Sequence, residues 1–195
     1  MADKEIFLLR HGDTGRQGVY IGSTDICLSP EGIRQVRATG ALLQNQKFDL
    51  VFCSPLLRCR QSWEQLQMDV PISVDGLLKE VDFGRWEGKS FAEIQKENPE
   101  ILASWINDPH RFSFPGGESL TDFYQRVHFT FQRLLEEPSK KILLITHGGI
   151  IRHLLCLFLG ISMDNYLIFD IQPGAYSSLA VYSEGGVLTA LNIRG

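Results

Sequence analysis

The feature that most constrains the fold of this chain is a pair of short apolar runs that each end in a histidine–glycine step. Glu5–Arg10 reads Glu-Ile-Phe-Leu-Leu-Arg and is followed by His11 and a glycine. Lys141–Thr146 reads Lys-Ile-Leu-Leu-Ile-Thr and is followed by His147 and a glycine. Nearly continuous apolar runs of this length are typical of strands that are buried on both faces. Such strands occur mainly in parallel sheets covered by helices, so the two runs favour a layered α/β fold.

Helix-forming patterns separate these strands. The Ser-Pro step at positions 29 and 30 places a capping side chain before a proline at the first helical position, and we expect a helix from there to about Gln44. A second Ser-Pro step, at positions 54 and 55, follows a predicted strand at Asp49–Cys53, so a second helix is expected to begin there. The strongest amphipathic pattern follows the capping residue Ser119. Its apolar residues at helical spacing are Leu120, Phe123, Tyr124, Val127, Phe131, Leu134 and Leu135.

Alternation of strands and helices over 195 residues predicts one α/β domain, residues 1–195. We expect a three-layer sandwich, a mostly parallel sheet with helices on both faces, and a cap or substrate-loop insertion at about 84–118. The other expected elements are extended segments at Val70–Val74 and Leu77–Val81, helices at Phe91–Glu97, Glu100–Asn107 and from His147 to Gly160, and a hairpin of Ser177–Tyr182 with Val187–Ile193.

Composition narrows the function classes. The net charge of −4 argues against a protein that binds nucleic acid or an anionic membrane. No apolar run reaches the roughly 20 residues of a membrane helix, and the first five residues lack the layout of a secretory signal. The four cysteines have no Cys-x-x-Cys spacing, so we expect reduced core thiols in a cytoplasmic protein. These cysteines are Cys27, Cys53, Cys59 and Cys156.

Four side chains suited to binding anions fall where strands are expected to end. Arg10 and His11 close the first strand, Arg58 lies just over one turn beyond the second, and His147 follows the apolar run that ends at position 146. Ligands of parallel sheets bind beyond these carboxyl ends. An arginine that closes a buried strand is costly unless an anion meets it, and phosphate suits both guanidinium groups and helix N-termini. Each residue alone has an ordinary structural explanation, but together they favour a phosphate site, to which Gly148 adds an open backbone amide.

Ordered motifs along the chain resemble those of the histidine phosphatase superfamily, which includes the cofactor-dependent phosphoglycerate mutases. Arg-His-Gly-Asp-Thr at positions 10–14 is similar to the family signature R-H-G-[ED]-[ST]. The other motifs are Ser-Pro-Leu-Leu-Arg at 54–58, Leu-Lys-Glu-Val-Asp-Phe-Gly-Arg-Trp-Glu-Gly at 78–88, Gly-Gly-Glu-Ser at 116–119 and Thr-His-Gly-Gly at 146–149. The correspondence covers about residues 5–160 and implies the phosphoglycerate mutase-like form of the α/β sandwich.

Carried over residue by residue, the resemblance implies catalysis through a phosphohistidine. His11 is the expected nucleophile, and Glu80 is the expected proton donor and acceptor, with Asp82 as its rival. A carboxylic acid is needed because an alkoxide leaves poorly, and the resulting carboxylate can then activate water against the phosphoenzyme.

The resemblance also implies a phosphate pocket formed by Arg10, Arg58 and His147, with an imidazolium at His147 able to add positive charge. Because these side chains supply the charge that phosphoryl transfer needs, no metal or other cofactor is expected. The full set of expected substrate-binding residues is Arg10, Arg58, His147, Gly148, Gln17 and Ser23.

Three features favour a phosphatase over a mutase. Two glycines follow His147 where glycolytic mutases have Gly-Asn-Ser, the segment after Glu80 differs from the mutase pattern, and the chain lacks the longer mutase insertion. Segments 20–25 and 105–108 look most like α-ribazole phosphatases and related small bacterial phosphatases. We therefore expect hydrolysis of a small phosphorylated metabolite, with α-ribazole 5′-phosphate as a candidate. Phosphoglycerate mutase-type transfer and a phosphosugar or bisphosphate phosphatase stay open as alternatives.

Substrate recognition is expected from the loops at Gly15–Asp25 and Glu87–Glu118. Their aromatic residues offer stacking surfaces or pack the cap onto the body, and packing is favoured for Trp105. The aromatic residues in question are Trp86, Trp105, Phe112 and Phe114.

Rival function classes were a metal hydrolase, a thiol phosphatase and a non-catalytic phosphate binder. The five histidines include no i, i+4 pair, and no cysteine lies in a glycine-rich loop that ends in arginine. The complete set of motif residues disfavours a mere binder. The expected partner is a small phosphorylated metabolite rather than nucleic acid or a membrane, and a homodimer stays open.

Overall fold

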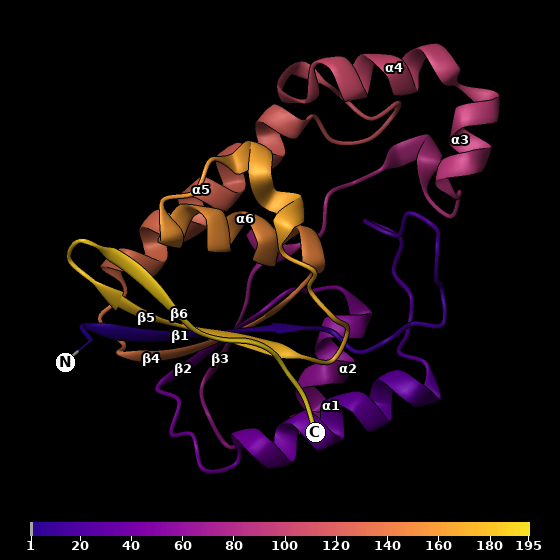
Figure 1. Ribbon diagram of the computed structural model, residues 1–195. Coiled ribbons are helices and arrows are strands. Elements are labelled where there is room, and N and C mark those ends of the chain that lie inside the picture. Colours follow the sequence, from indigo (N-terminus) through magenta and orange to yellow (C-terminus); the bar gives the residue numbers. More distant parts are fainter. Residues whose placement is uncertain (1) are drawn as a thin grey trace.

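A six-stranded mixed sheet forms the centre of the molecule in the computed structural model, which describes residues 2–195 (Figure 1). The strands are β1 (Lys4–Arg10), β2 (Leu50–Cys53), β3 (Ile72–Val74), β4 (Lys141–Thr146), β5 (Tyr176–Tyr182) and β6 (Gly185–Ile193). Their order is β3-β2-β4-β1-β5-β6; the first four are mutually parallel, and the hairpin of β5 and β6 extends the sheet antiparallel to β1. The predicted mostly parallel sheet is confirmed.

Helices cover both faces of this sheet. Helices α1 (Pro30–Leu43) and α2 (Leu57–Leu66) lie on one face, and α5 (Leu120–Glu136) and α6 (Gly148–Leu159) lie on the other (Figure 1). Alternate residues of β1 supply the two cores, because successive side chains of a strand point to opposite faces. Phe7 and Leu9 pack toward α1 and α2, whereas Ile6 and Leu8 pack toward α5 and α6. The three-layer α/β sandwich is therefore also confirmed.

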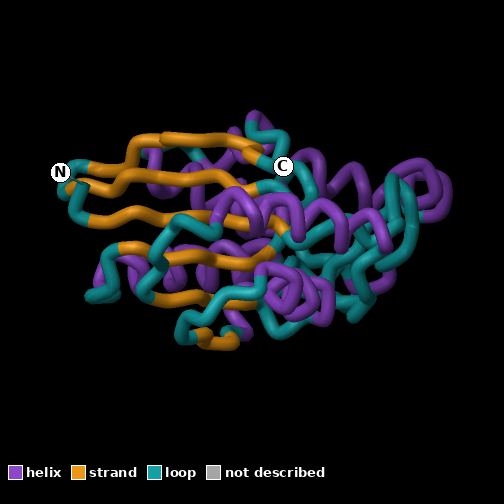
Figure 2. The backbone as a smooth tube through the Cα atoms, turned by 90° about the horizontal axis from the view of Figure 1, so that it is seen from below, coloured by secondary structure: helices purple, strands orange, loops and turns teal. Residues whose placement is uncertain are grey.

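The segment at 84–118 lies beyond the carboxyl ends of the parallel strands, as the views in Figures 1 and 2 agree. It contains η2 (Gly84–Trp86), α3 (Phe91–Glu97), α4 (Pro99–Asn107) and η3 (Pro109–Arg111). Trp86 is fully buried and packs against Trp105, Phe112 and Phe114, with ring centroids 5.6 Å away in each case. Phe112 and Phe114 are buried too and contact each other edge-on, so these aromatic side chains form a core within the segment at 84–118.

Several local predictions were wrong in detail. Leu77–Val81 was predicted to be extended, but the chain forms the 3-10 helix η1 (Gly76–Leu78) and then an irregular segment. The Asp75 carboxylate caps that turn by accepting a hydrogen bond from the Leu77 N–H at 2.9 Å. Of the extended segment predicted at Val70–Val74, only β3 forms a strand.

The second Ser-Pro step does not start its helix. Helix α2 begins at Leu57, and the Ser54 hydroxyl lies 2.8 Å from Nε2 of the His147 ring. The prediction that all four cysteines are core thiols was wrong for Cys27, which is exposed, whereas the other three are buried.

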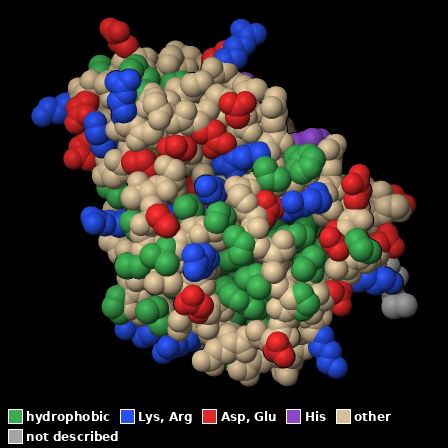
Figure 3. Space-filling view, turned by 180° about the vertical axis from the view of Figure 1, so that it is seen from behind, with side chains coloured by type: hydrophobic (Ala, Val, Ile, Leu, Met, Phe, Trp, Pro, Cys, Tyr) green, Lys and Arg blue, Asp and Glu red, His purple; other side chains and the backbone are tan. Residues whose placement is uncertain are grey.

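The surface carries a mixture of charges. Viewed from behind, positive and negative side chains are interspersed around hydrophobic ones that gather on the lower half of the molecule (Figure 3). Within residues 2–195, every helix is too short or too polar to cross a membrane.

Candidate active site

The two histidine–glycine steps meet at the carboxyl ends of β1 and β4. These strands pair in parallel with Arg10 opposite Thr146, so His11 and His147 leave the sheet side by side. Their ring centroids lie 5.1 Å apart. Arg58 comes from the first turn of α2 and reaches both rings, which brings together the side chains that the sequence placed at different strand ends.

The His11 ring is held in one tautomer. Its Nδ1 lies 2.8 Å from the Gly12 carbonyl oxygen, which can only accept, so the ring proton resides on Nδ1. Nε2 then carries a lone pair and accepts a hydrogen bond from the Arg58 Nε at 3.3 Å. Burial and the charges of Arg10 and Arg58 lower the His11 pKa well below its usual value, so the ring is neutral at pH 7. A neutral imidazole whose Nε2 carries no proton can act as a nucleophile.

A glycine is required immediately after this histidine. A Cβ atom on Gly12 would lie 2.4 Å from the Gly32 carbonyl oxygen of α1. The backbone of the His11 loop therefore sits directly on α1, which fixes the position of the ring above the sheet.

Arg58 is the central cation of the site and only 1% of its surface is exposed. Its Nη1 and Nη2 donate to the carbonyl oxygens of Thr24, at 3.0 Å, and Gly22, at 2.7 Å. Its Nε faces both histidines and donates to His147 Nδ1 at 3.2 Å. The carbonyls orient the guanidinium but do not neutralise it, so a buried positive charge faces His11.

Arg10 has unused hydrogen-bonding capacity. Its Nη1 donates to the Ile171 carbonyl at 2.6 Å, but its buried Nε–H has no partner among residues 2–195. The first residue of α6, Gly148, lies alongside, since a Cβ there would be 3.5 Å from the Arg10 Cζ. A helix N-terminus and an unpaired buried N–H together favour an anionic guest.

His147 is fully buried and neutral in this structure. Because Nδ1 accepts from Arg58, the ring proton lies on Nε2 and points at the Ser54 hydroxyl, 2.8 Å away. Burial, followed by His11 and Arg58, lowers its pKa well below the usual value. The imidazolium expected from the sequence is therefore absent at pH 7 without an anion; a bound phosphate would favour the charged form.

Glu80 is held against the start of α6. Its Oε2 accepts a hydrogen bond from the Gly149 N–H at 2.9 Å, and its Oε1 accepts from the Val81 N–H at 3.1 Å. A Cβ on Gly149 would lie 2.3 Å from Oε1, so a larger residue there would displace the Glu80 carboxylate. Asp82 is turned elsewhere and accepts from the Ser23 hydroxyl at 2.8 Å. Glu80, rather than Asp82, is thus placed at the same helix end as the histidines.

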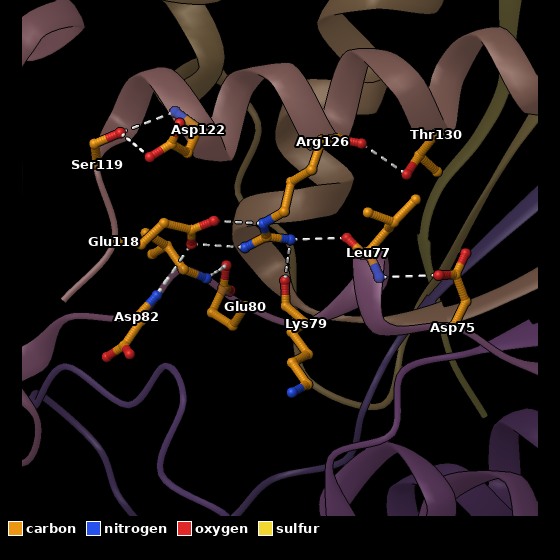
Figure 4. Close-up of polar contacts among 11 residues, drawn as sticks. Asp75, Leu77, Lys79, Glu80, Asp82, Glu118, Ser119, Asp122, Arg126 and Thr130 are labelled. Atoms are coloured by element: carbon orange, nitrogen blue, oxygen red, sulfur yellow. Dashed lines mark hydrogen bonds and ion pairs between the residues drawn. The ribbon is translucent and has the colours of Figure 1, made fainter.

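An ion pair that sequence reasoning missed holds the segment around Glu80 (Figure 4). Arg126 of α5 binds Glu118 through Nε at 2.6 Å and Nη2 at 2.9 Å. Its Nη1 donates to the carbonyls of Leu77, at 2.7 Å, and Lys79, at 2.6 Å. The Glu118 oxygen that binds Nη2 also accepts a hydrogen bond from the Asp82 N–H at 3.3 Å. The pair therefore fixes the backbone on both sides of Glu80. The glutamate of the Gly-Gly-Glu-Ser motif was the only residue of this ion pair that the sequence motifs included.

A third arginine near the phosphate-binding groups was also missed. Arg152 of α6 donates from Nε to the Phe169 carbonyl at 2.8 Å, and its charge contributes to lowering the Arg10 pKa, for which burial is the main cause. Arg152 follows His147 by just over one helical turn. This spacing shows which face of the helix the side chain shares, but it does not show which other part of the protein that face contacts.

A cavity of about 520 Å³ opens next to Glu80 and Gly149. Its walls are mainly aromatic and aliphatic and come chiefly from the segment at 84–118, α5, α6 and η4 (Met163–Ile168). Its lining includes Tyr20, Phe83, Trp105, Phe123, Tyr124 and Tyr166. Trp105 packs against Trp86 within the segment at 84–118, and it also lines this cavity. It is therefore placed both to pack this segment and to offer an aromatic surface to a ligand.

Two predicted substrate-binding residues, Gln17 and Ser23, form no side-chain hydrogen bond with the histidines among residues 2–195. Gln17 is exposed and lines a separate hollow of about 440 Å³ with Arg16 and Val19. Ser23 is exposed and its hydroxyl is bonded to Asp82. The backbone on either side of Ser23 nevertheless binds Arg58 through the carbonyls of Gly22 and Thr24. In the part of the chain described, residues 2–195, no three His, Cys, Asp or Glu side chains are grouped to hold a metal ion.

Comparisons with known proteins agree with this geometry. The model of the histidine phosphatase superfamily (branch 1) matches residues 6–194. The chain is 29% identical over 194 residues to the adenosylcobalamin/alpha-ribazole phosphatase of Escherichia coli (strain K12), covering 97% of this chain and 96% of that protein. It is 27% identical over 198 residues to phosphoserine phosphatase 1 of Hydrogenobacter thermophilus, covering 97% and 92%. The crystal structure of the alpha-ribazole phosphatase from Shigella flexneri matches with a TM-score of 0.88 and 29% identity, covering 97% of this chain and 96% of that one. The chain belongs to the histidine phosphatase superfamily.

Proposed function

We propose that this protein is a metal-independent phosphomonoesterase that hydrolyses a small phosphorylated metabolite through a phosphohistidine. The observation that carries the proposal is the environment of His11 Nε2: a lone pair on a neutral ring, beside the buried guanidinium of Arg58 and near the unpaired N–H of Arg10. A nucleophile surrounded by positive charge suits attack on a phosphate ester, whose transition state spreads negative charge over three oxygens.

The first half-reaction transfers the phosphoryl group to the protein. His11 Nε2 forms a bond to phosphorus while the bond from phosphorus to the ester oxygen breaks. Arg10, Arg58 and the N-terminus of α6 stabilise the phosphoryl oxygens. Glu80, in its protonated form, gives its proton to the departing oxygen, so the alcohol leaves neutral.

The second half-reaction returns the free protein. The Glu80 carboxylate removes a proton from a water molecule as that water attacks phosphorus, and the bond to His11 Nε2 breaks. Inorganic phosphate leaves, and Glu80 is again protonated for the next cycle. The Gly12 carbonyl keeps the His11 proton on Nδ1 throughout, which leaves Nε2 as the only reactive nitrogen.

For the substrate class, we propose that the alcohol of the ester occupies the 520 Å³ cavity beside Glu80, with the segment at 84–118 acting as the substrate cap of a single domain, residues 1–195. The mainly aromatic and aliphatic walls suit an alcohol with a large apolar body, which phosphoserine lacks. α-Ribazole 5′-phosphate therefore fits this cavity better than phosphoserine does. The buried thiols Cys53, Cys59 and Cys156 support a reducing compartment, the cytoplasm, as the place of action.

A panel of phosphate esters tests this function. Phosphate release from 4-nitrophenyl phosphate, α-ribazole 5′-phosphate and O-phosphoserine is measured with a chelator present, and conversion of 3-phosphoglycerate to its isomer is followed in parallel. We expect hydrolysis that the chelator does not affect and a higher kcat/KM for the ribazole ester than for phosphoserine. Isomer formation without phosphate release would instead identify a mutase, and loss of activity in chelator would identify a metal enzyme.

A further inference from the structure

One wall of the cavity beside Glu80 contains a histidine that the proposed reaction does not use. His153 lies on α6, one turn after Gly149, and only 3% of its surface is exposed. Aromatic rings enclose it: Tyr166 stacks on it with centroids 4.5 Å apart and an interplanar angle of 22°, and Phe123 packs edge-on at 5.1 Å. This polar ring lies in a wall that is mainly aromatic and aliphatic and that also contains Glu80 and Arg152.

The hydrogen-bonding state of this ring follows from its single partner. His153 Nδ1 lies 2.7 Å from the Gly149 carbonyl oxygen, so the ring proton resides on Nδ1. Nε2 then carries a lone pair, and it has no hydrogen-bond partner among residues 2–195. Burial lowers the His153 pKa to about 4, so the ring stays neutral at pH 7 and Nε2 can only accept.

A buried acceptor without a donor is unfavourable, and a ligand in the cavity that His153 lines can supply the missing donor. We infer that His153 is a specificity-determining residue whose Nε2 accepts a hydrogen bond from an N–H or O–H group on the alcohol portion of the substrate. This inference rests on the proposed function for the identity of that alcohol, but the subsite itself does not depend on catalysis.

The chemical class of the ligand follows from the other walls. Phe123, Tyr124 and Trp105 favour a flat aromatic or otherwise apolar body, and Leu167 and Ile106 line the cavity although 68% and 64% of their surfaces are exposed. A ligand that covers these two side chains would remove apolar surface from water. The substrate class is therefore the phosphate ester of an aromatic alcohol that carries a hydrogen-bond donor on its body.

Two matched alcohols test the subsite without any turnover. 2-(Indol-3-yl)ethanol carries a ring N–H, and 2-(1-methylindol-3-yl)ethanol has the same shape with a methyl group in its place. Calorimetry measures the dissociation constant of each with the wild-type protein, His153→Phe, His153→Gln and the control His128→Phe, which alters an exposed histidine on α5. We expect the wild type and His128→Phe to bind the N–H compound about tenfold more tightly, as is usual when a buried acceptor would otherwise stay unpaired.

The preference should shrink to within about twofold in His153→Phe and be partly retained in His153→Gln, whose amide oxygen still accepts. Equal binding of both alcohols by the wild type would overturn the inference, and so would no binding of either alcohol up to about 10 mM, where even a weak site is occupied. If His153→Phe does not fold, the wild type and His153→Gln decide the question alone. Hydrolysis of the phosphate esters of the two alcohols separates the two proposals. A tenfold binding preference without turnover would reject the phosphatase and support the subsite. Turnover without a binding preference would support the phosphatase and reject the subsite.

Discussion

The Nε atom of Arg58 donates a hydrogen bond to Nε2 of His11 over 3.3 Å. A guanidinium group can only donate, so the histidine nitrogen must accept with a lone pair. The same contact places a permanent positive charge next to the atom that would attack phosphorus. The side chain that helps to keep His11 unprotonated and the one that would stabilise the phosphate are thus the same, and it enters the site from α2.

Arg58→Lys should therefore lower kcat/KM strongly although it retains the charge. Lysine has no planar fork and cannot donate at once to the Thr24 and Gly22 carbonyls and to both histidines. We expect a loss of about 100-fold in kcat/KM for 4-nitrophenyl phosphate, the usual size for one lost transition-state donor. Arg60→Lys, at an exposed position of the same helix, is the control and should stay within about twofold. An unchanged kcat/KM in Arg58→Lys would show that this side chain does not touch the phosphate.

Glu80→Gln should separate substrates by their leaving groups. The amide cannot donate a proton as the acid does, so esters of ordinary alcohols should lose about 10²–10⁴-fold in the rate of phosphoenzyme formation. Aryl phosphates with acidic leaving groups need less protonation and should lose less. Single-turnover kinetics on an alkyl and an aryl phosphate measure both rates. Asp82→Asn serves as the comparison, and a larger leaving-group effect there would transfer the acid role to Asp82.

Arg126→Met tests the ion pair that holds the Glu80 segment. Loss of the guanidinium frees the backbone carbonyls of Leu77 and Lys79 and leaves Glu118 without its partner. We expect stability to fall by about 3 kcal/mol and kcat for alkyl phosphates to fall more than kcat for aryl phosphates, because Glu80 is displaced. Urea unfolding and the two kcat values are the readouts. The matched control is Arg34→Met, which removes the exposed pair with Glu31. A loss of stability with the same fractional loss of kcat on both substrates would mean that the pair has only a structural role.

The buried histidines should make the protein less stable in mild acid. His11, His147 and His153 all have folded-state pKa values below 6.5, and that of His153 is about 4. Below pH 6.5 the unfolded chain binds protons at these rings while the folded protein does not, so the free energy of unfolding falls as pH falls. Each histidine contributes about 1.4 kcal/mol per pH unit between its two pKa values.

Urea unfolding of the wild type and of His153→Phe between pH 7 and pH 5 measures this effect. Because His153→Phe removes one of these rings, its free energy of unfolding should fall less steeply with falling pH, by the contribution of one proton. A slope that is the same in the wild type and His153→Phe would mean that His153 is already charged in the folded protein.

The strands and long helices could be predicted because burial of one or both faces of an element requires apolar residues at a regular spacing in the sequence. β1 and β4 are continuous apolar runs buried on both faces, and α5 shows its apolar stripe directly. The segment Leu77–Val81 was predicted wrongly because no regular apolar spacing determines its conformation. Its conformation depends on Arg126, which lies far along the chain and binds its backbone carbonyls. No local pattern records such a contact.

The central residues of the site were accessible from the sequence because strand ends converge in a parallel sheet. His11 and His147 were placed by their strands, and the glycines after them by the need for close backbone approach. Arg152 and His153 could not be found this way, because a helix pattern gives their spacing but not which face turns toward the cavity. Gln17 and Ser23 were proposed from a resemblance in loops, whose paths depend on tertiary contacts such as the one between Ser23 and Asp82.

The central claim is that His11 Nε2 takes the phosphoryl group from the substrate. Rapid mixing of the wild-type protein with a ³²P-labelled phosphate ester, followed by denaturation in base, measures label bound to the protein. The account predicts label that is stable in base and released by acid in the wild type, near-complete absence of label in a folded His11→Asn variant, and retention of label in the Arg34→Met control. Base-stable label in His11→Asn, or turnover by that variant at the wild-type rate, would contradict it.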